Sequence, residues 1–385
     1  MLTFVHYVGA QMRGPVLALY AAAHGATPSG VGLIMGAHMM AAAVGSMPFG
    51  RASDVCGRRP FMIGGMALSV VTSLLLPIVE DWRVLALVYG VAGFGVAAFT
   101  PSALSVVGDA APTDKIGHAY AWYSTAHYGA IAVGPFLGGI VTEPWGYRAT
   151  FILSAAVIAA ALVIGECMLA RETARTTARS SGTFAEIERN TGVWAGWIIS
   201  LSGLVVQGVV FPFLPLVASE RGLGPAAIGL VFLVLGLANT AARLPAGWLI
   251  DRTRRTAVYA VGGVLAASAA TALLPHASDL WATLALVALF GGASGVAFVA
   301  ISVALTAATV PSVRGLVMGG YSTSLYLGFA LGSVALGPVA TRHGYPAAFG
   351  VGAAIAAMGT LIAGLLWARH ARMSQAPARP RAPGR

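Results

Sequence analysis

Long apolar segments follow one another along the whole chain at nearly regular intervals. A helix needs roughly 20 apolar residues to cross a bilayer, and each segment is close to that length. Short connections rich in polar residues, Gly and Pro separate them. The pattern predicts an all-α integral membrane protein with twelve transmembrane helices over residues 2–23, 30–49, 61–79, 84–108, 118–141, 149–169, 192–218, 226–248, 257–275, 281–308, 316–341 and 347–368.

The composition supports a membrane protein and argues against a soluble enzyme. Of the 385 residues, 57% are hydrophobic and only 9% are charged, whereas soluble proteins average about 25% charged residues. Cys56 and Cys167 match no metal or redox spacing. No glycine loop followed by Lys and Ser or Thr, as in a primary pump, is present. We therefore expect no enzymatic activity, no cofactor and no metal site.

The distribution of Lys and Arg predicts the orientation, because cytoplasmic loops are enriched in them. With both termini in the cytoplasm, seventeen basic residues lie on the cytoplasmic side and four on the other. This placement accounts for the net charge of +10 without a nucleic-acid partner. We expect a multi-pass protein of the cell inner membrane, in contact with membrane lipids.

The longest polar stretch predicts a division into two halves. Residues 170–191 are expected to form a cytoplasmic linker, with a short surface helix near Phe184–Arg189, between an N-terminal half (1–169) and a C-terminal half (192–368). The Pro- and Arg-rich tail 369–385 is expected to be disordered.

The two halves repeat in sequence. Residues of the first half recur at an offset of 197 and, further on, at 198. The matching pairs include Pro15 and Pro212, Gly25 and Gly222, Pro28 and Pro225, Asp54 and Asp251, Tyr123 and Tyr321, Tyr128 and Tyr326, and Gly139 and Gly337. Parallel repeats of this kind place a solute site between the halves, near the membrane midplane.

A charged motif follows the second predicted helix, and a weaker copy follows the eighth. Residues 50–59 read G-R-A-S-D-V-C-G-R-R, which resembles the loop 2–3 signature of the major facilitator superfamily. The positions concerned are Gly50, Asp54, Gly57, Arg58 and Arg59, and in the copy Arg243, Gly247, Asp251 and Arg252.

This resemblance implies the major facilitator fold, with two pseudo-symmetric six-helix halves, and secondary transport. It also implies that Asp54 contacts the start of helix 11, near Gly315, and helps to hold the cytoplasmic side closed. One departure is Val55, where the family often has a basic residue.

A second motif lies in the fifth predicted helix. Gly134, Pro135, Gly138 and Gly139 resemble the G-P-x-x-G-G core of the family's antiporter signature, which implies export. The match is partial, because Ala130 stands where the family has glycine. In helix 4, Tyr89 replaces the Arg that proton-coupled exporters of the family often carry, so the usual element of proton coupling is absent.

The ionisable residues inside the membrane suggest the solute's charge. All acidic residues map to loops or helix ends, whereas Arg13, His38 and His127 lie within helices, where charge is costly and usually functional. We expect these three to converge in the N-terminal half. Further candidate solute contacts are Tyr20, Tyr89 and Tyr123, with Gln207, Asn239 and Tyr321 across from them.

A cavity with fixed positive charge and no carboxylate favours an anion. The leading hypothesis is proton-coupled export of a small organic molecule, preferably acid-bearing, by a monomer. Arg13 would anchor the solute, and His38 or His127 would carry the proton. Arg13 could instead bond carbonyls freed by Pro15, and the histidines could be packing residues. Three different functions stay open: uptake or exchange of an organic anion, export of cationic drugs, and a non-transporting receptor or scaffold.

Overall fold

The computed structural model describes residues 1–112, 115–169, 187–188, 190–310 and 313–375. These residues are almost entirely helical. The ten α-helices are α1 (Leu2–Ala23), α2 (Pro28–Cys56), α3 (Arg58–Leu75), α4 (Trp82–Ala110), α5 (Ile116–Met168), α6 (Thr191–Glu220), α7 (Pro225–Thr253), α8 (Thr256–Leu273), α9 (Leu280–Ala307) and α10 (Arg314–Gln375). Two 3₁₀ turns, η1 (Leu76–Ile78) and η3 (Leu274–His276), follow α3 and α8.

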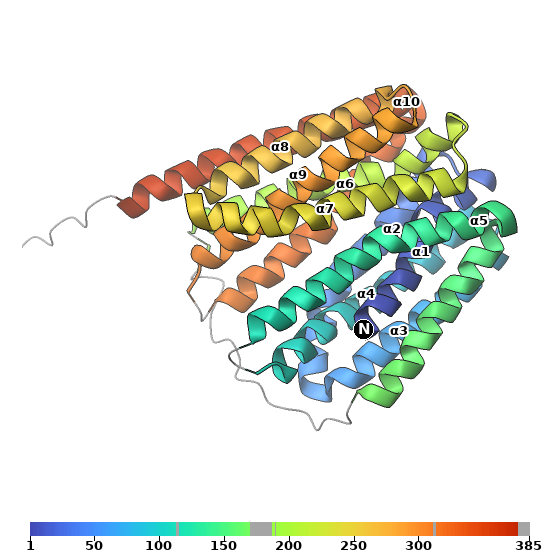
Figure 1. Ribbon diagram of the computed structural model, residues 1–385, viewed down its shortest axis with the longest axis horizontal. Coiled ribbons are helices and arrows are strands. Elements are labelled where there is room, and N and C mark those ends of the chain that lie inside the picture. The colour runs from blue at the N-terminus through green and yellow to red at the C-terminus, as the bar shows by residue number, and fades with distance from the viewer. Residues whose placement is uncertain (113–114, 170–186, 189, 311–312, 376–385) are drawn as a thin grey trace, which may run out of the picture.

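Two of these helices double back on themselves. The backbone is non-helical at Gly146 in α5 (φ 78°) and at Gly344 in α10 (φ 81°). A positive φ suits glycine because it has no Cβ. Each helix therefore consists of two arms, and Figure 1 shows α5 crossing the molecule and returning. With each arm counted separately, the described helices overlap all twelve predicted segments, and the number of spanning helices stays a prediction.

Most of the described helices are suited to a bilayer. Among the described residues, nine helices are long and apolar enough to span a membrane, with α5 and α10 each counted once. Helix α1, which carries His6, Gln11 and Arg13, is not among the nine. The predicted all-α membrane fold is confirmed, and no strand occurs in the part of the chain that the structure describes.

The sequence repeat corresponds to a repeat of backbone conformation. Gly25 and Gly222 have φ values of 83° and 80°, and Gly146 and Gly344 have 78° and 81°. At the 197 offset, Gly57 (φ 91°) is matched by Arg254, which has a φ of 55° without being glycine. Both copies of the charged motif therefore turn at a residue with positive φ, although ψ is 150° at Gly57 and 20° at Arg254.

The two halves meet along two seams. One seam joins α2 to α10 and the other joins α5 to α7. We call the end with the Gly146 and Gly344 turns the hairpin end, and the end with the Gly57 and Arg254 turns the linker end. Figure 1 shows α5 and α7 converging at the hairpin end and diverging toward the linker end.

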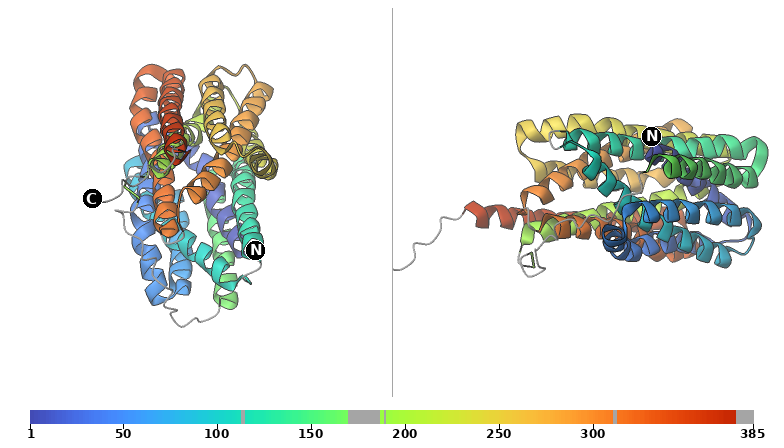
Figure 2. Two further views of the ribbon diagram at one scale, coloured as in Figure 1. Left: turned by 90° about the vertical axis from the view of Figure 1, so that its left-hand side faces the viewer. Right: turned by 90° about the horizontal axis from the view of Figure 1, so that it is seen from below.

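The C-terminal helix is longer than predicted. Helix α10 continues to Gln375, beyond the expected end at 368, and Figure 2 shows it extending past the rest of the bundle. Residues 376–385 and most of the predicted surface helix near Phe184–Arg189 lie outside the described residues.

Candidate functional site

The glycines of the antiporter-like motif allow α5 to approach two helices closely. A Cβ at Gly134 would lie 2.9 Å from the Val8 carbonyl oxygen. One at Gly138 would lie 2.1 Å from that of Met12, and one at Gly139 would lie 2.2 Å from that of Pro225. Val8 and Met12 belong to α1 of the same half, whereas Pro225 belongs to α7 of the other half. The motif therefore packs one half internally and also closes a seam.

The charged motif at the linker end forms ion pairs within the N-terminal half. Arg58 lies 3.6 Å from Asp54 and 2.5 Å from Asp109 of α4, and Arg59 pairs with Glu166 of α5. These bridges join the α2–α3 turn to two other helix ends. The Asp54 side chain is 48% exposed. The expected contact between Asp54 and the eleventh predicted segment, which forms the first arm of α10, stays a prediction.

In the second copy of the motif, no ion pair forms among the described residues. The guanidinium carbon of Arg252 lies 5.4 Å from the centroid of the Trp248 ring, and a Cβ at Gly247 would meet nothing within 4 Å. Asp251 is exposed at the linker end. Arg243 lies deeper and belongs to a different cluster, described below.

Arg13 lies inside the N-terminal half. The guanidinium is buried and donates to the Ser73 hydroxyl at 2.6 Å and the Ser69 carbonyl at 3.4 Å, both in α3. It also lies 5.6 Å from the centroid of the Tyr89 ring. The His38 ring stacks on the Tyr89 ring with 4.2 Å between centroids, and its Nδ1 lies 2.9 Å from the Tyr89 carbonyl oxygen. Arg13, His38 and Tyr89 therefore come together among α1, α2 and α4, whereas His127, which was expected to join Arg13 and His38, contacts Tyr7 and Tyr128 instead.

A second group spans the two halves, and we call it the cross-half cluster. Its members are Tyr7, Tyr123, His127 and Tyr128 from the N-terminal half and Asn239, Arg243, Tyr321 and Tyr326 from the C-terminal half.

Arg243 connects the halves within this cluster. Its guanidinium carbon lies 3.4 Å from the centroid of the Tyr128 ring in α5. Its Nε donates to the Asn239 side-chain oxygen at 3.1 Å, and the Asn239 amide donates to the Gly291 carbonyl at 3.1 Å. An arginine over an aromatic face is attracted by the ring quadrupole. Asn239 thus orients Arg243 toward the N-terminal half.

Several buried polar atoms here have no hydrogen-bond partner. They are Nη2 of Arg243, Nδ1 of His127, the Tyr123 hydroxyl and both ring nitrogens of His6. The His6 ring lies 5.2 Å from that of Tyr7, which lies 4.2 Å from that of His127. Buried polar groups are normally hydrogen-bonded, so each exception calls for an explanation. The atoms without a partner thus gather in and beside the cross-half cluster.

Part of this cluster was not predicted from the sequence. Arg243 was assigned to the gating motif, and Tyr7, Tyr128 and Tyr326 were not among the predicted solute contacts. Tyr326 lies beside Tyr7 and Thr100, and Tyr321 lies near Tyr128 and Arg243. The signal that could have found them is the repeat, which pairs Tyr128 with Tyr326.

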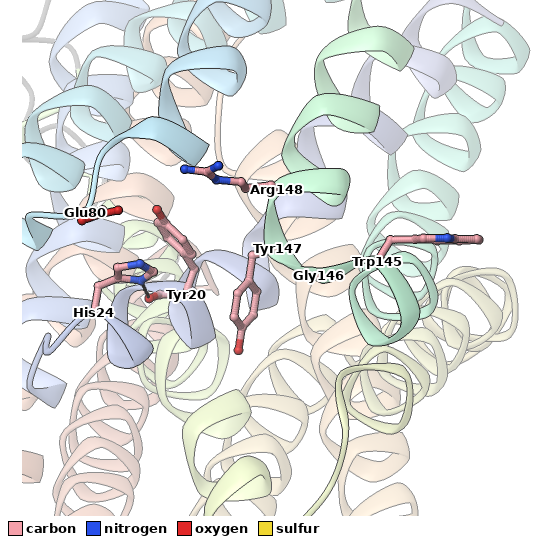
Figure 3. Close-up of a pocket in the computed structure, with 7 residues that line it drawn as sticks. All are labelled: Tyr20, His24, Glu80, Trp145, Gly146, Tyr147 and Arg148. Carbon is pink, nitrogen blue, oxygen red and sulfur yellow. Dashed lines mark hydrogen bonds between the residues drawn. The ribbon is translucent and has the colours of Figure 1, made fainter.

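The remaining predicted contacts lie elsewhere. Gln207 is half-buried in α6 and has no side-chain hydrogen bond to the described residues. Tyr20 donates to the Val79 carbonyl at 3.1 Å and lines a cavity of about 290 Å³ at the hairpin end. Figure 3 shows Tyr20 there between His24 and Arg148. With Glu80 and Arg148 both lining it, this cavity favours neither sign of charge.

Comparisons with known proteins place the whole chain in one family. The model of the Major Facilitator Superfamily matches residues 1–216 and 196–384. An uncharacterized MFS-type transporter of Methanocaldococcus jannaschii is 23% identical over 343 residues, covering 87% of this chain and 88% of that protein. The inner membrane transport protein YajR of Escherichia coli is 24% identical over 341 residues, covering 84% and 72%.

Shorter and structural similarities agree. The multi-drug resistance efflux pump PmrA of Streptococcus pneumoniae is 30% identical over 141 residues, 36% of this chain and 34% of that protein. The nucleoside transporter NupG has a similar structure (TM-score 0.80, 13% identity, 95% and 98% of the two chains). So does a bacterial homologue of the lysosomal transporter Spinster, inward-facing and occupied (TM-score 0.79, 14% identity, 98% and 97%).

Proposed function

Because this chain belongs to the major facilitator superfamily, we propose that it exports a small acid-bearing organic molecule in exchange for protons, by alternating access. Membership of the family makes it a transporter and a multi-pass membrane protein. We propose in addition the acidic nature of the solute, the coupling to protons and the outward direction. We also propose that the protein acts as a monomer in the inner membrane, with both termini in the cytoplasm.

The observation that carries the proposal is the free end of Arg243. Asn239 holds one nitrogen of the guanidinium, while Nη2 is buried without a partner at the junction of the halves. An arginine can present paired donors to a carboxylate or phosphate. A solute bound there would contact both halves, as alternating access requires.

The distribution of acidic residues supports an anionic solute. Those that the structure describes lie at helix ends or beside the turns, as Asp109 and Glu143 do. A cation at the cluster would meet Arg243 with no carboxylate to offset it. The tyrosine rings around Arg243 would suit the apolar body of an organic acid.

The exchange with protons and the direction rest on two further features. His127 carries an unpartnered nitrogen within the cluster and lies within electrostatic reach of Arg243, so a proton on His127 and the positive charge of Arg243 would repel each other. His38 is bonded to the Tyr89 carbonyl, which favours a packing role. Export is supported by the antiporter-like motif and by the local similarity to PmrA, an efflux pump.

Arg13 is a weaker candidate for the anchor. Its donors already bind Ser73 and the Ser69 carbonyl, so a solute would have to displace them. The Arg13 anchor stays a prediction, and its contacts favour a structural role.

A thermal-shift screen of the purified protein tests the proposal, because a ligand that binds the folded state raises the melting temperature. Organic anions should stabilise the protein, Arg243→Ala should abolish the effect, and Arg243→Lys should retain part of it. Arg252→Ala is the matched control, since Arg252 lies over Trp248 outside the cluster. Stabilisation by lipophilic cations that Arg243→Ala leaves intact would instead indicate a cationic drug exporter.

Proteoliposomes then test direction and coupling. An inward-directed proton gradient should drive the stabilising anion out of vesicles whose cytoplasmic face is inside, and His127→Gln should flatten the pH dependence of the rate. Accumulation of the anion in those vesicles would indicate uptake, and no solute movement would indicate a receptor or scaffold.

A further inference from the structure

We infer that Glu143 and Thr341 are two equivalent latches that hold the hairpin end closed by capping, across the seams, the first turns of helices in the opposite half. The inference concerns the conformational cycle and holds for any solute, so it does not depend on the proposed anion site.

The Glu143 latch joins α5 to α7. One carboxylate oxygen accepts the backbone N–H of Ala226 at 2.8 Å. Ala226 follows Pro225 in the first turn of α7, where backbone N–H groups have no partner within the helix. The helix dipole also favours a negative charge at this position.

Helix α7 has no cap of its own. Its N-cap residue is Gly224, which has no side chain to accept a first-turn N–H. A Cβ at Gly224 would lie 2.9 Å from the Glu143 carboxylate oxygen, so the space that a capping side chain would need is occupied by Glu143. The cap of α7 is therefore supplied by the other half.

The Thr341 latch is the counterpart on the second seam. The Thr341 hydroxyl oxygen accepts the backbone N–H of Ser29 at 3.0 Å and lies 2.8 Å from the Ser29 hydroxyl. Ser29 lies in the first turn of α2. This helix also has its own cap, because the Thr27 hydroxyl accepts the Gly30 N–H at 3.4 Å. Losing Thr341 should therefore cost α2 less than losing Glu143 costs α7.

The two latches occupy equivalent places in the repeat. Glu143 and Thr341 are 198 residues apart, the offset that relates α5 to α10. Each lies one helical turn beyond a glycine of close approach: Gly139 faces Pro225, and Gly337 faces Ser29. The same contact made twice, with different chemistry, indicates that it belongs to the closed state of this end.

Alternating access requires these seams to part. When α5 moves from α7, the Ala226 N–H loses the side-chain acceptor that Glu143 provides. Loss of an N-cap costs about 1 kcal/mol, which corresponds to a roughly fivefold change in an equilibrium. The latches therefore bias the protein toward the state that is open at the linker end.

Spin-label distances across the hairpin end test the inference in the full chain, reconstituted in nanodiscs without solute. Glu80→Cys and Ser278→Cys provide equivalent exposed label sites in the two halves, in a background with Cys56→Ser and Cys167→Ser. Pulsed electron–electron double resonance then measures the distances between the two labels, and their distribution gives the ratio of separated to closed hairpin ends.

Glu143→Ala should raise this ratio about fivefold, and Glu143→Gln, which keeps an acceptor but no charge, should raise it less. Thr341→Val should have a smaller effect than Glu143→Ala. Thr306→Val is its matched control, because the Thr306 hydroxyl donates to the Ser302 carbonyl of its own helix. An unchanged ratio in Glu143→Ala overturns the inference, as does a fall in melting temperature that leaves the distances unchanged.

Discussion

Two adjacent glycines, Gly138 and Gly139, should respond differently to substitution by alanine. Alanine at 139 would place its Cβ 2.2 Å from the Pro225 carbonyl oxygen of the other half. Ordinary contact begins at 3.4 Å, so α5 and α7 would have to separate by about 1.2 Å at a close-packed seam. We expect Gly139→Ala to disfavour the closed hairpin end.

The magnitude follows from the cost of overpacking. Inserting a methyl group into a tightly packed contact costs about 1–3 kcal/mol. Because the strain at Gly139 exists only while the seam is closed, opening the seam relieves it. A cost of about 2 kcal/mol would raise the ratio of separated to closed hairpin ends roughly 30-fold.

Gly138→Ala provides the contrast. Its Cβ would lie 2.1 Å from the Met12 carbonyl oxygen of α1 in the same half, so opening the seam relieves nothing. We expect this variant to lower the melting temperature and leave the conformational ratio unchanged. Gly350→Ala is the control, because a Cβ there meets nothing within 4 Å. This variant should neither lower the melting temperature nor change the conformational ratio.

The assay is the spin-label pair at positions 80 and 278, combined with thermal unfolding of each variant. An unchanged distance distribution in Gly139→Ala would show that the Pro225 contact does not strain the closed seam. Equal shifts in both alanine variants would show that the effect is not specific to the seam contact of Gly139.

Two further predictions concern residues within the halves. Arg13→Ala should lower the free energy of unfolding by about 2 kcal/mol, because it removes charged hydrogen bonds to Ser73 and Ser69. Unfolding measurements should show this loss of stability, and anion-binding measurements should show unchanged affinity. A loss of affinity alone would restore Arg13 as the anchor. Arg254→Gly should raise the melting temperature, because a left-handed φ of 55° costs a non-glycine residue about 1–2 kcal/mol; a lower melting temperature would show that the Arg254 side chain stabilises the turn by more than the strain costs.

The sequence was sufficient for most of the fold, because a bilayer imposes simple rules on it. Spanning helices need long apolar runs, so α1 was predicted at its observed bounds and most other ends within a few residues. The repeat anticipated equivalent turns, and Gly146 and Gly344 have nearly equal φ values. The end of α10 lies beyond the predicted end because Arg369, His370 and Arg372 interrupt the apolar run, although Arg, Ala and Met continue a helix readily.

The site could be predicted less well from the sequence, because a helical pattern shows which residues share a face but not which residues that face contacts. Arg13 and Arg243 are both arginines within helices. Only the packing shows that Arg13 binds α3 of its own half, whereas Arg243 reaches across to Tyr128. Glu143 appeared in the sequence as one of many acidic residues at helix ends.

The sequence by itself thus determined the helices, their pseudo-symmetric order and the scarcity of buried acidic groups, since these depend on local hydropathy and on repetition. The tertiary structure decided which polar groups are already bonded, which remain without a partner at the junction of the halves, and which helix ends are capped across a seam. These properties depend on distances of a few ångströms between residues far apart in the chain, and an apolar pattern cannot specify such distances.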